Sequence, residues 1–272
     1  MHQSTPRRLR AVSLSLLIPA LLLLALPGAN RATLAQTSPA LSPTQVRTPI
    51  QTVGDFYKAL RERRFREAFA LSIYKPAIDG LSAEEFAELQ PEFEKLAGAV
   101  PEKIEFGGEQ ISGNMATVFA RVGGEIAPLE AITLMRGGDG AWIFGDPEAQ
   151  EIVRRDGKEF FLKARIETHH KEVEALLLKI ADAQAGYAAV HSGQFADMAA
   201  LLESKPSLRE DVESAQTLGY TFQITPGKDG KTYKVNAEPL RYGRTGLLSY
   251  YSDQGGMQKK DTGGKPYNPP KK

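Results

Sequence analysis

The chain has 272 residues, of which 42% are hydrophobic and 25% charged, a composition typical of globular proteins rather than collagen, coiled coils or disordered polymers. Its 34 basic and 33 acidic residues give a net charge of +1, which provides no charge excess for binding nucleic acid. The absence of cysteine excludes disulfides, thiol catalysis, zinc–cysteine sites and a lipid anchor on a cysteine. At ~100–150 residues per domain, the length corresponds to about two domains.

The segment 1–35 has the organisation of a secretory signal peptide. A basic start with three arginines precedes an apolar run at 11–26. As a helix this run would span roughly 24 Å, less than the ~30 Å of a bilayer core. Small residues follow, and we expect cleavage after Ala35. The alternative is an uncleaved N-terminal anchor.

The mature chain is predicted to be slightly acidic. Removal of residues 1–35 takes away four of the 34 basic residues and none of the 33 acidic ones, leaving 30 against 33 and a net charge of −3. We therefore expect neither nucleic acid nor an anionic membrane as a partner, and no stable membrane span after cleavage. Residues 36–47, rich in Ser, Thr and Pro, are predicted to form a flexible lead. These features predict an exported protein in the periplasm, outside the cell or on its surface.

Residues 48–146 are predicted to form an α+β domain in which helices precede an antiparallel sheet. Thr48-Pro49-Ile50-Gln51 has the residue types of a capping box at a helix start. A second short helix is expected from Phe65 until Lys75-Pro76 ends it, and a third after Ser82, with Pro91 kinking or dividing the third. Strand-like patterns follow near residues 104–106, 115–122, 129–135 and 141–144.

The helix segment Phe56-Tyr57-Lys58-Ala59-Leu60 and the closing segment Gly140-Ala141-Trp142-Ile143-Phe144 carry a family resemblance. With them, residues 46–146 resemble the cone-shaped domains of the nuclear transport factor two-like superfamily, in particular its small exported members of unknown function. The resemblance implies early helices covering a curved sheet, here called the cone. Because this fold hosts isomerases, dehydratases, binding modules and assembly domains, it does not choose a function.

The cone would have one candidate ligand pocket, lined by the aromatic residues Phe56, Phe119 and Trp142. The alternative interpretation is that these three residues simply pack in the core. An enzyme would also need a titratable group with a tuned pKa in the cone. The acids available are Asp55, Glu105 and Glu130, whose neighbours favour a solvated position. We therefore expect no catalytic residue.

The histidines are the remaining candidates for metal ligands. His169 and His170 are adjacent, and adjacent residues point ~100° apart on a helix, which makes them poor joint ligands. Their pairing with nearby glutamates, and the position of His191, are typical of a helix surface. We expect no metal and no cofactor.

Residues 147–164 are predicted to be a linker or helical bridge, and residues 165–260 a second α+β domain. Apolar residues at helical spacing predict a long helix over about 158–192, which would run ~50 Å if unbroken. A further helical turn is expected near 195–202, and the polar stretch 206–218 is predicted to be a loop. Strands are predicted at 219–224, 232–237, 247–251 and around Met257, and residues 261–272 are predicted to be a disordered tail.

A second resemblance lies in these strands. It is carried by Gly219-Tyr220-x-Phe222, Tyr233-x-Val235-x-Ala237-x-Pro239 and Thr245-Gly246-Leu247-x-Ser249-Tyr250-Tyr251-x-Asp253-x-Gly255, after the helical Ala183-Gln184-x-x-Tyr187. About residues 165–260 are similar to the globular part of type IV pilin-like and pseudopilin-like proteins. The chain departs from that family because no Gly-Phe prepilin junction precedes the helix and another domain intervenes. Ordinary pilin processing and polymerisation are therefore not implied.

The sequence favours an exported, non-enzymatic envelope protein that acts as a binding or assembly module with an envelope protein as partner. Two alternatives stay open. One is a small-molecule-binding protein, isomerase or hydrolase that uses the cone cavity. The other, which follows from the second resemblance alone, is an accessory component of a type II or type IV pilus-like secretion system.

Overall fold

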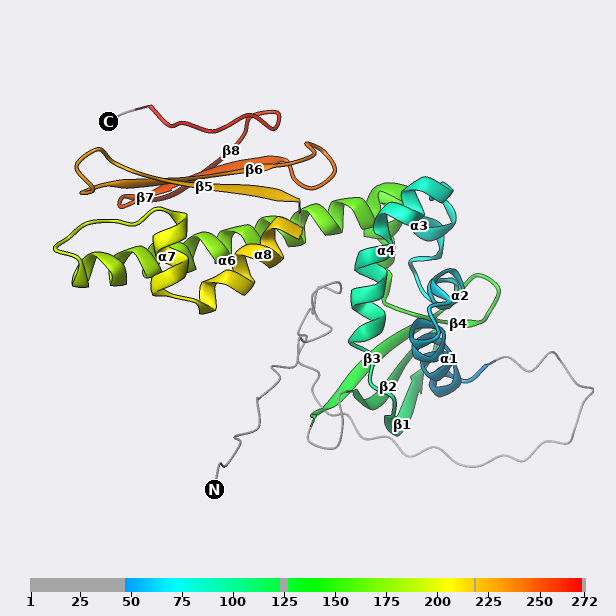
Figure 1. The fold of residues 1–272 in the computed structure, drawn as a ribbon. Helices are drawn as coiled ribbons and strands as arrows, with labels where there is room; N and C mark the ends of the chain where they lie inside the picture. The colour runs from blue at the N-terminus through cyan, green and yellow to red at the C-terminus, as the bar shows by residue number, and fades with distance from the viewer. Residues whose placement is uncertain (1–46, 123–126, 218, 271–272) are drawn as a thin grey trace, which may run out of the picture. The chain divides into compact units, whose positions relative to one another are not determined.

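The computed structural model describes residues 47–122, 127–217 and 219–270. The chain divides into two compact units between Phe160 and Phe161. Each unit combines helices with its own four-stranded antiparallel sheet, which confirms the predicted α+β class (Figure 1). The predicted signal peptide, its cleavage after Ala35 and the lead up to residue 46 lie outside the described residues. Within the described part of the chain, no helix is both long and apolar enough to cross a membrane.

The first unit begins with four helices and continues with a sheet of order β1-β2-β3-β4. The helices are α1 (Pro49–Arg61), α2 (Phe65–Ala70), α3 (Lys75–Asp79) and α4 (Ala83–Gly98). The strands are β1 (Ile104–Ser112), β2 (Met115–Val122), β3 (Leu129–Arg136) and β4 (Trp142–Phe144). Helix α5 (Pro147–Asp156) and a 3₁₀ turn (Gly157–Glu159) complete the unit.

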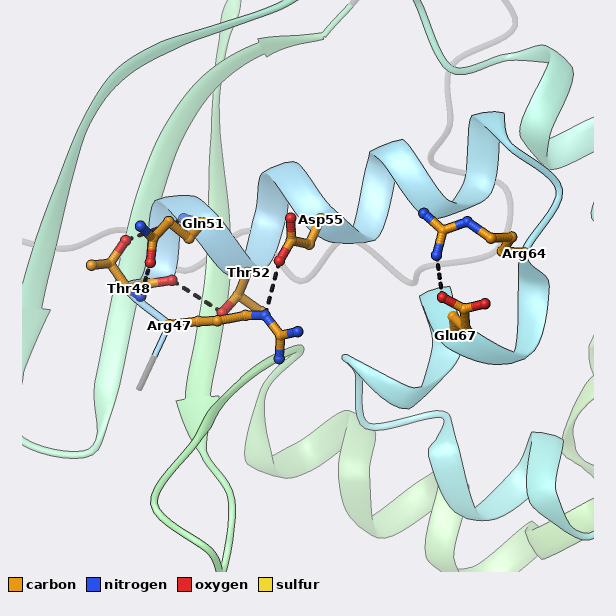
Figure 2. A network of polar contacts seen from close by, with 7 residues as sticks. All are labelled: Arg47, Thr48, Gln51, Thr52, Asp55, Arg64 and Glu67. Atoms are coloured by element: carbon orange, nitrogen blue, oxygen red, sulfur yellow. Dashed lines mark hydrogen bonds and ion pairs between the residues drawn. The ribbon is translucent and has the colours of Figure 1, made fainter. Parts of the chain in front are cut away.

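The start of α1 has the predicted capping box (Figure 2). The Thr48 hydroxyl accepts a hydrogen bond from the Gln51 backbone N–H at 3.2 Å, and the Thr48 N–H donates to Gln51 Oε1 at 2.9 Å. These bonds satisfy two groups that a helix start would otherwise leave unpaired. Figure 2 also shows two exposed ion pairs, which contribute little to stability: Arg47–Asp55 and Arg64–Glu67.

The structure corrects the prediction for one proline and one of the two alternatives given for another. Lys75-Pro76 does not end the second helix, because α2 already ends at Ala70 and α3 begins at Lys75. Proline suits a first helical turn, where its missing N–H would have no intrahelical partner. Pro91 does not divide α4, which continues through it. The buried side chains of Leu89 and Phe93, on either side of Pro91, hold the helix against the core despite the lost hydrogen bond.

The core of the first unit lies between α1 and one face of the sheet. The helix contacts β1, β2 and β4. Val118 pairs with Ile132, and Leu134 pairs with Phe144, so these buried side chains point to the same face. The Phe56 ring of α1 stacks on the Phe144 ring with 4.7 Å between centroids, which fills the face under the helix with aromatic contacts.

The second unit consists of a long helix, two shorter helices and a sheet of order β5-β6-β7-β8. The helices are α6 (Phe160–Val190), α7 (Met198–Ser204) and α8 (Ser207–Thr217), and the strands are β5 (Tyr220–Pro226), β6 (Tyr233–Pro239), β7 (Leu248–Asp253) and β8 (Gly256–Asp261). The predicted long helix is one unbroken element of 31 residues, ~46 Å in length. All three helices lie on one side of the sheet (Figure 1).

Helix α8 corrects the loop predicted for 206–218. Its described apolar residues, Leu208 and Val212, lie one turn apart and are 2% and 3% exposed. They join the core that α6 forms with the sheet. Burial of these two side chains stabilises a helix whose other residues are mainly polar, which sequence polarity alone did not reveal.

The segment after β8 contacts the sheet. Residues 262–270, for which the sequence predicts disorder, have no regular secondary structure. The Asn236 side chain donates from Nδ2 to the Tyr267 carbonyl oxygen at 2.9 Å, and the Ser249 and Thr262 hydroxyls lie 2.9 Å apart. Asn236 and Ser249 are buried, so these contacts supply partners for polar groups inside the unit.

Candidate functional site

The three residues proposed for a pocket do not share one face of the first sheet. Phe56 and Trp142 are each 5% exposed, and the Arg136 guanidinium covers the Trp142 ring at 4.4 Å from its centroid. Phe119 follows the buried Val118 on β2, so its side chain points to the opposite face of the sheet. The structure thus places Phe56 and Trp142 among core contacts and separates Phe119 from both.

The acids of the first unit are also not gathered around a buried site. Asp55 is exposed and pairs with Arg47 at 2.9 Å. Glu105 lies 3.5 Å from Arg121 in an ion pair on the sheet. Glu130 is exposed; its charge adds to the effect of burial in raising the pKa of Tyr57. None of the three is the isolated buried carboxylate that an enzyme in the cone would need.

In the second unit, the connection between β6 and β7, residues 240–247, has several exposed apolar side chains, and we call it the docking loop. Its sequence is LRYGRTGL. Three of its large apolar side chains are exposed: Leu240 by 61%, Tyr242 by 45% and Leu247 by 37%. Contiguous exposed apolar patches are typical of surfaces that contact another molecule, and these three side chains lie within one segment of eight residues.

Polar side chains of α6 hold the backbone of the docking loop. Arg165 donates from Nη2 to the Arg244 carbonyl oxygen at 3.0 Å. His169 Nδ1 lies 2.9 Å from the Thr245 carbonyl oxygen, which can only accept, so Nδ1 is the donor. Arg165 and His169 are one helical turn apart and are 6% and 5% exposed. The loop therefore has fixed partners in the core of the unit.

His170 holds the end of the loop as a hydrogen-bond acceptor, whereas His169 is a donor. Its Nε2 accepts from the backbone N–H of Leu247 at 3.0 Å and from that of Leu248 at 3.3 Å. The sequence predicts that the two adjacent histidines lie on a helix surface, which is wrong for His169, because it is buried; both are anchors for one loop. The third, His191, stacks on Tyr187 with 3.7 Å between centroids.

Two glycines allow the loop to approach β5 closely. A Cβ on Gly246 would lie 1.9 Å from the Tyr220 hydroxyl oxygen, and a Cβ on Gly219 would lie 2.4 Å from a Thr245 methyl group. Gly219 also has φ +81°, a conformation that favours glycine. The Tyr220 hydroxyl donates to the Leu248 carbonyl oxygen at 2.9 Å. These contacts fix the loop from the sheet side as α6 fixes it from the helix side.

The chemical groups that the docking loop contains are apolar, aromatic and basic. In residues 47–122, 127–217 and 219–270, no group of three histidine, aspartate or glutamate side chains is placed to hold a metal ion. Tyr242 donates to Asp261 Oδ2 at 3.0 Å, and this hydrogen bond raises the pKa of Tyr242, so its hydroxyl stays neutral. The loop thus presents neutral apolar and aromatic groups beside the charged Arg241 and Arg244.

Comparison of the chain with known protein families, with curated proteins and with solved structures finds no match. The case for a function therefore rests on the residues and the geometry described above.

Between the strands predicted at 232–237 and 247–251, the sequence also predicts a loop at 243–246, but it does not identify this loop as a site. The available signal was the alternation of Leu240, Tyr242 and Leu247 with arginines and glycines, because buried strands rarely place arginine among their apolar residues. The anchoring role of His169 and His170 had no signal in the sequence, since it depends on contacts with residues more than seventy positions away.

Proposed function

We propose that this chain is an exported, non-enzymatic envelope protein that binds a partner protein through the docking loop. The observation that carries the proposal is the exposure of Leu240, Tyr242 and Leu247 on a loop whose backbone is held by buried side chains. The export itself is inferred from the signal-peptide pattern of residues 1–35.

The composition of the loop suits a protein interface. Tyrosine and arginine are enriched among the residues that contribute most to protein–protein binding, and the loop has Tyr242, Arg241 and Arg244. Because the loop backbone already has partners, it would lose little conformational freedom on binding. A preorganised loop of this kind favours specific binding of one partner over adaptable binding of many.

The alternative of a ligand cavity in the cone has less support. Phe56 stacks on Phe144 and Trp142 is covered by Arg136, so both aromatic rings have protein neighbours where a ligand would be expected.

The test is a capture experiment with the full chain and two matched variants. Leu240→Asp places a charge in the docking loop, and Leu178→Asp places the same charge on α6, where Leu178 is 60% exposed against 61% for Leu240. Each protein is immobilised, exposed to an envelope extract of the source cells, and checked for native circular dichroism.

We expect a distinct protein to be captured by the wild-type chain and by Leu178→Asp, and about tenfold less of it by Leu240→Asp, which corresponds to a loss of about 1.4 kcal/mol. Equal capture by all three proteins would contradict a docking role for residues 240–247.

A further inference from the structure

The two adjacent histidines on α6 respond differently to a proton. His169 donates to the Thr245 carbonyl, and its Nδ1 carries a hydrogen in both the imidazolium and the neutral tautomer that makes this bond. His170 accepts from the N–H groups of Leu247 and Leu248, which only a neutral imidazole can do. A proton on Nε2 of His170 would point at two backbone N–H groups and remove both hydrogen bonds.

We propose that protonation of His170 releases the end of the docking loop from α6, so that mild acid weakens binding of the partner protein. The second half of this statement rests on the function proposed above, whereas the release of the loop does not. The affected residue Leu247 belongs to the docking loop, and Leu248 is the first residue of β7.

The release is confined to one end of the loop. Arg165 and His169 donate to the carbonyl groups of Arg244 and Thr245, and a guanidinium remains a donor at all relevant pH values. The bonds made by these two side chains therefore persist when His170 is charged. Acid would free the segment around Leu247 while leaving the preceding turn attached.

The titratable groups facing His170 come from three elements. Helix α6 contributes Glu167, His169 and Glu174, strand β8 contributes Lys259, and β7 contributes Tyr250, whose ring centroid lies 6.3 Å from that of His170. Glu174 would favour the charged imidazole. However, its Oε1 already accepts from Lys259 Nζ at 2.8 Å and from the Tyr250 hydroxyl at 3.3 Å, which offsets part of its charge.

Burial keeps His170 neutral near pH 7. Burial lowers the pKa of His170 below its usual 6.5, against the opposing charge of Glu174. When the pKa of a histidine is lower in the folded state than in the unfolded state, its full contribution to stability is present above the unfolded pKa, where the histidine is neutral in both states. Its contribution is lost progressively as the pH falls from 6.5 towards the lower folded value, so release is expected in that acidic window.

Hydrogen exchange of the full chain, followed by mass spectrometry, tests the release directly. Exchange of the peptide containing Leu247 and Leu248 is measured at about pH 7.5 and about pH 5, with correction for intrinsic exchange, for wild type, His170→Gln and His169→Gln. Glutamine at 170 can accept through its side-chain oxygen but does not titrate. Glutamine at 169 keeps a side-chain N–H donor and leaves His170 intact.

We expect protection of this peptide in the wild type and in His169→Gln to fall about tenfold in acid, the effect of losing two hydrogen bonds. In His170→Gln, protection should be the same at both pH values. Unchanged protection in the wild type would overturn the proposal, as would an equal acid loss in His170→Gln. The wild-type result stands by itself if the His170→Gln chain does not fold.

A second arm repeats the capture experiment at both pH values. Loss of capture in acid by the wild type, with capture retained by His170→Gln, supports the link between the switch and binding. If the loop is released in acid but capture by the wild type is unchanged, the proposed effect on partner binding is wrong, whereas the release of the loop is confirmed. If the loop remains protected, the switch is overturned whatever partner is captured.

Discussion

At the scale of single residues, a buried amide joins α6 to the segment before α7. Gln184 is 0% exposed; its Nε2 donates to the Ala196 carbonyl at 2.7 Å, and its Oε1 accepts from the Ala196 N–H at 2.9 Å. Gln184→Met keeps the size but leaves both backbone groups of Ala196 unpaired. We predict a free energy of unfolding lower by about 2–6 kcal/mol, at ~1–3 kcal/mol for each of the two buried groups. Urea unfolding followed by circular dichroism measures it.

The matched control is Gln223→Met on β5, where the glutamine side chain is exposed. This change should alter the free energy of unfolding by less than about 0.5 kcal/mol. If both variants lose the same stability, the hydrogen bonds of Gln184 to Ala196 are not what makes that position important.

At the scale of elements, two glycines of the second unit should respond oppositely to alanine. Gly186 lies inside α6 with open space around its Cα, so Gly186→Ala should stabilise the chain by about 1 kcal/mol through helix propensity. Gly246 faces the Tyr220 hydroxyl, and Tyr220 is fully buried. Gly246→Ala must displace that ring and should destabilise the chain by about 1–3 kcal/mol. The same urea unfolding experiment compares the two variants.

The change in the free energy of unfolding caused by Gly246→Ala tests the close approach of the docking loop to β5. A variant as stable as the wild type, with unchanged circular dichroism, would show that residues 240–247 are not packed against β5 as described. A destabilising Gly186→Ala would instead indicate that α6 is not helical at that point.

The elements with strong local signals were predictable from the sequence. The capping box at Thr48 gave the start of α1, and apolar spacing gave the unbroken α6. Helix α8 was missed because its described apolar face consists of Leu208 and Val212 alone, too few for a periodic signal. Its stability comes from packing against residues distant in sequence, which no local pattern encodes.

The candidate site was predictable only in part, for the same reason. Loop position follows from Gly243 and Gly246, but the hydrogen bonds from His169 and His170 depend on how α6 meets the sheet. Strand alternation places Phe119 on the face opposite Val118. The sequence alone could not tell which of these two faces is buried.

At the scale of the whole molecule, the proposed function requires export. We predict that the protein isolated from the envelope or medium of its source cells begins at Gln36, because the apolar run at 11–26 is too short for a stable span and small residues precede Ala35. Intact-mass spectrometry of the purified protein measures this. A chain that retains residues 1–35 in the membrane fraction would support the uncleaved anchor instead.

The central claim, that residues 240–247 contact a partner protein, is tested most directly by a photo-crosslinking amino acid placed in the full chain within its source cells. One variant carries the crosslinker at Leu240 in the docking loop, and the other carries it at Leu178, which is equally exposed on α6. We predict that light produces a discrete adduct with one protein from position 240 and not from position 178. No adduct from position 240, or the same adducts from both positions, would contradict the claim.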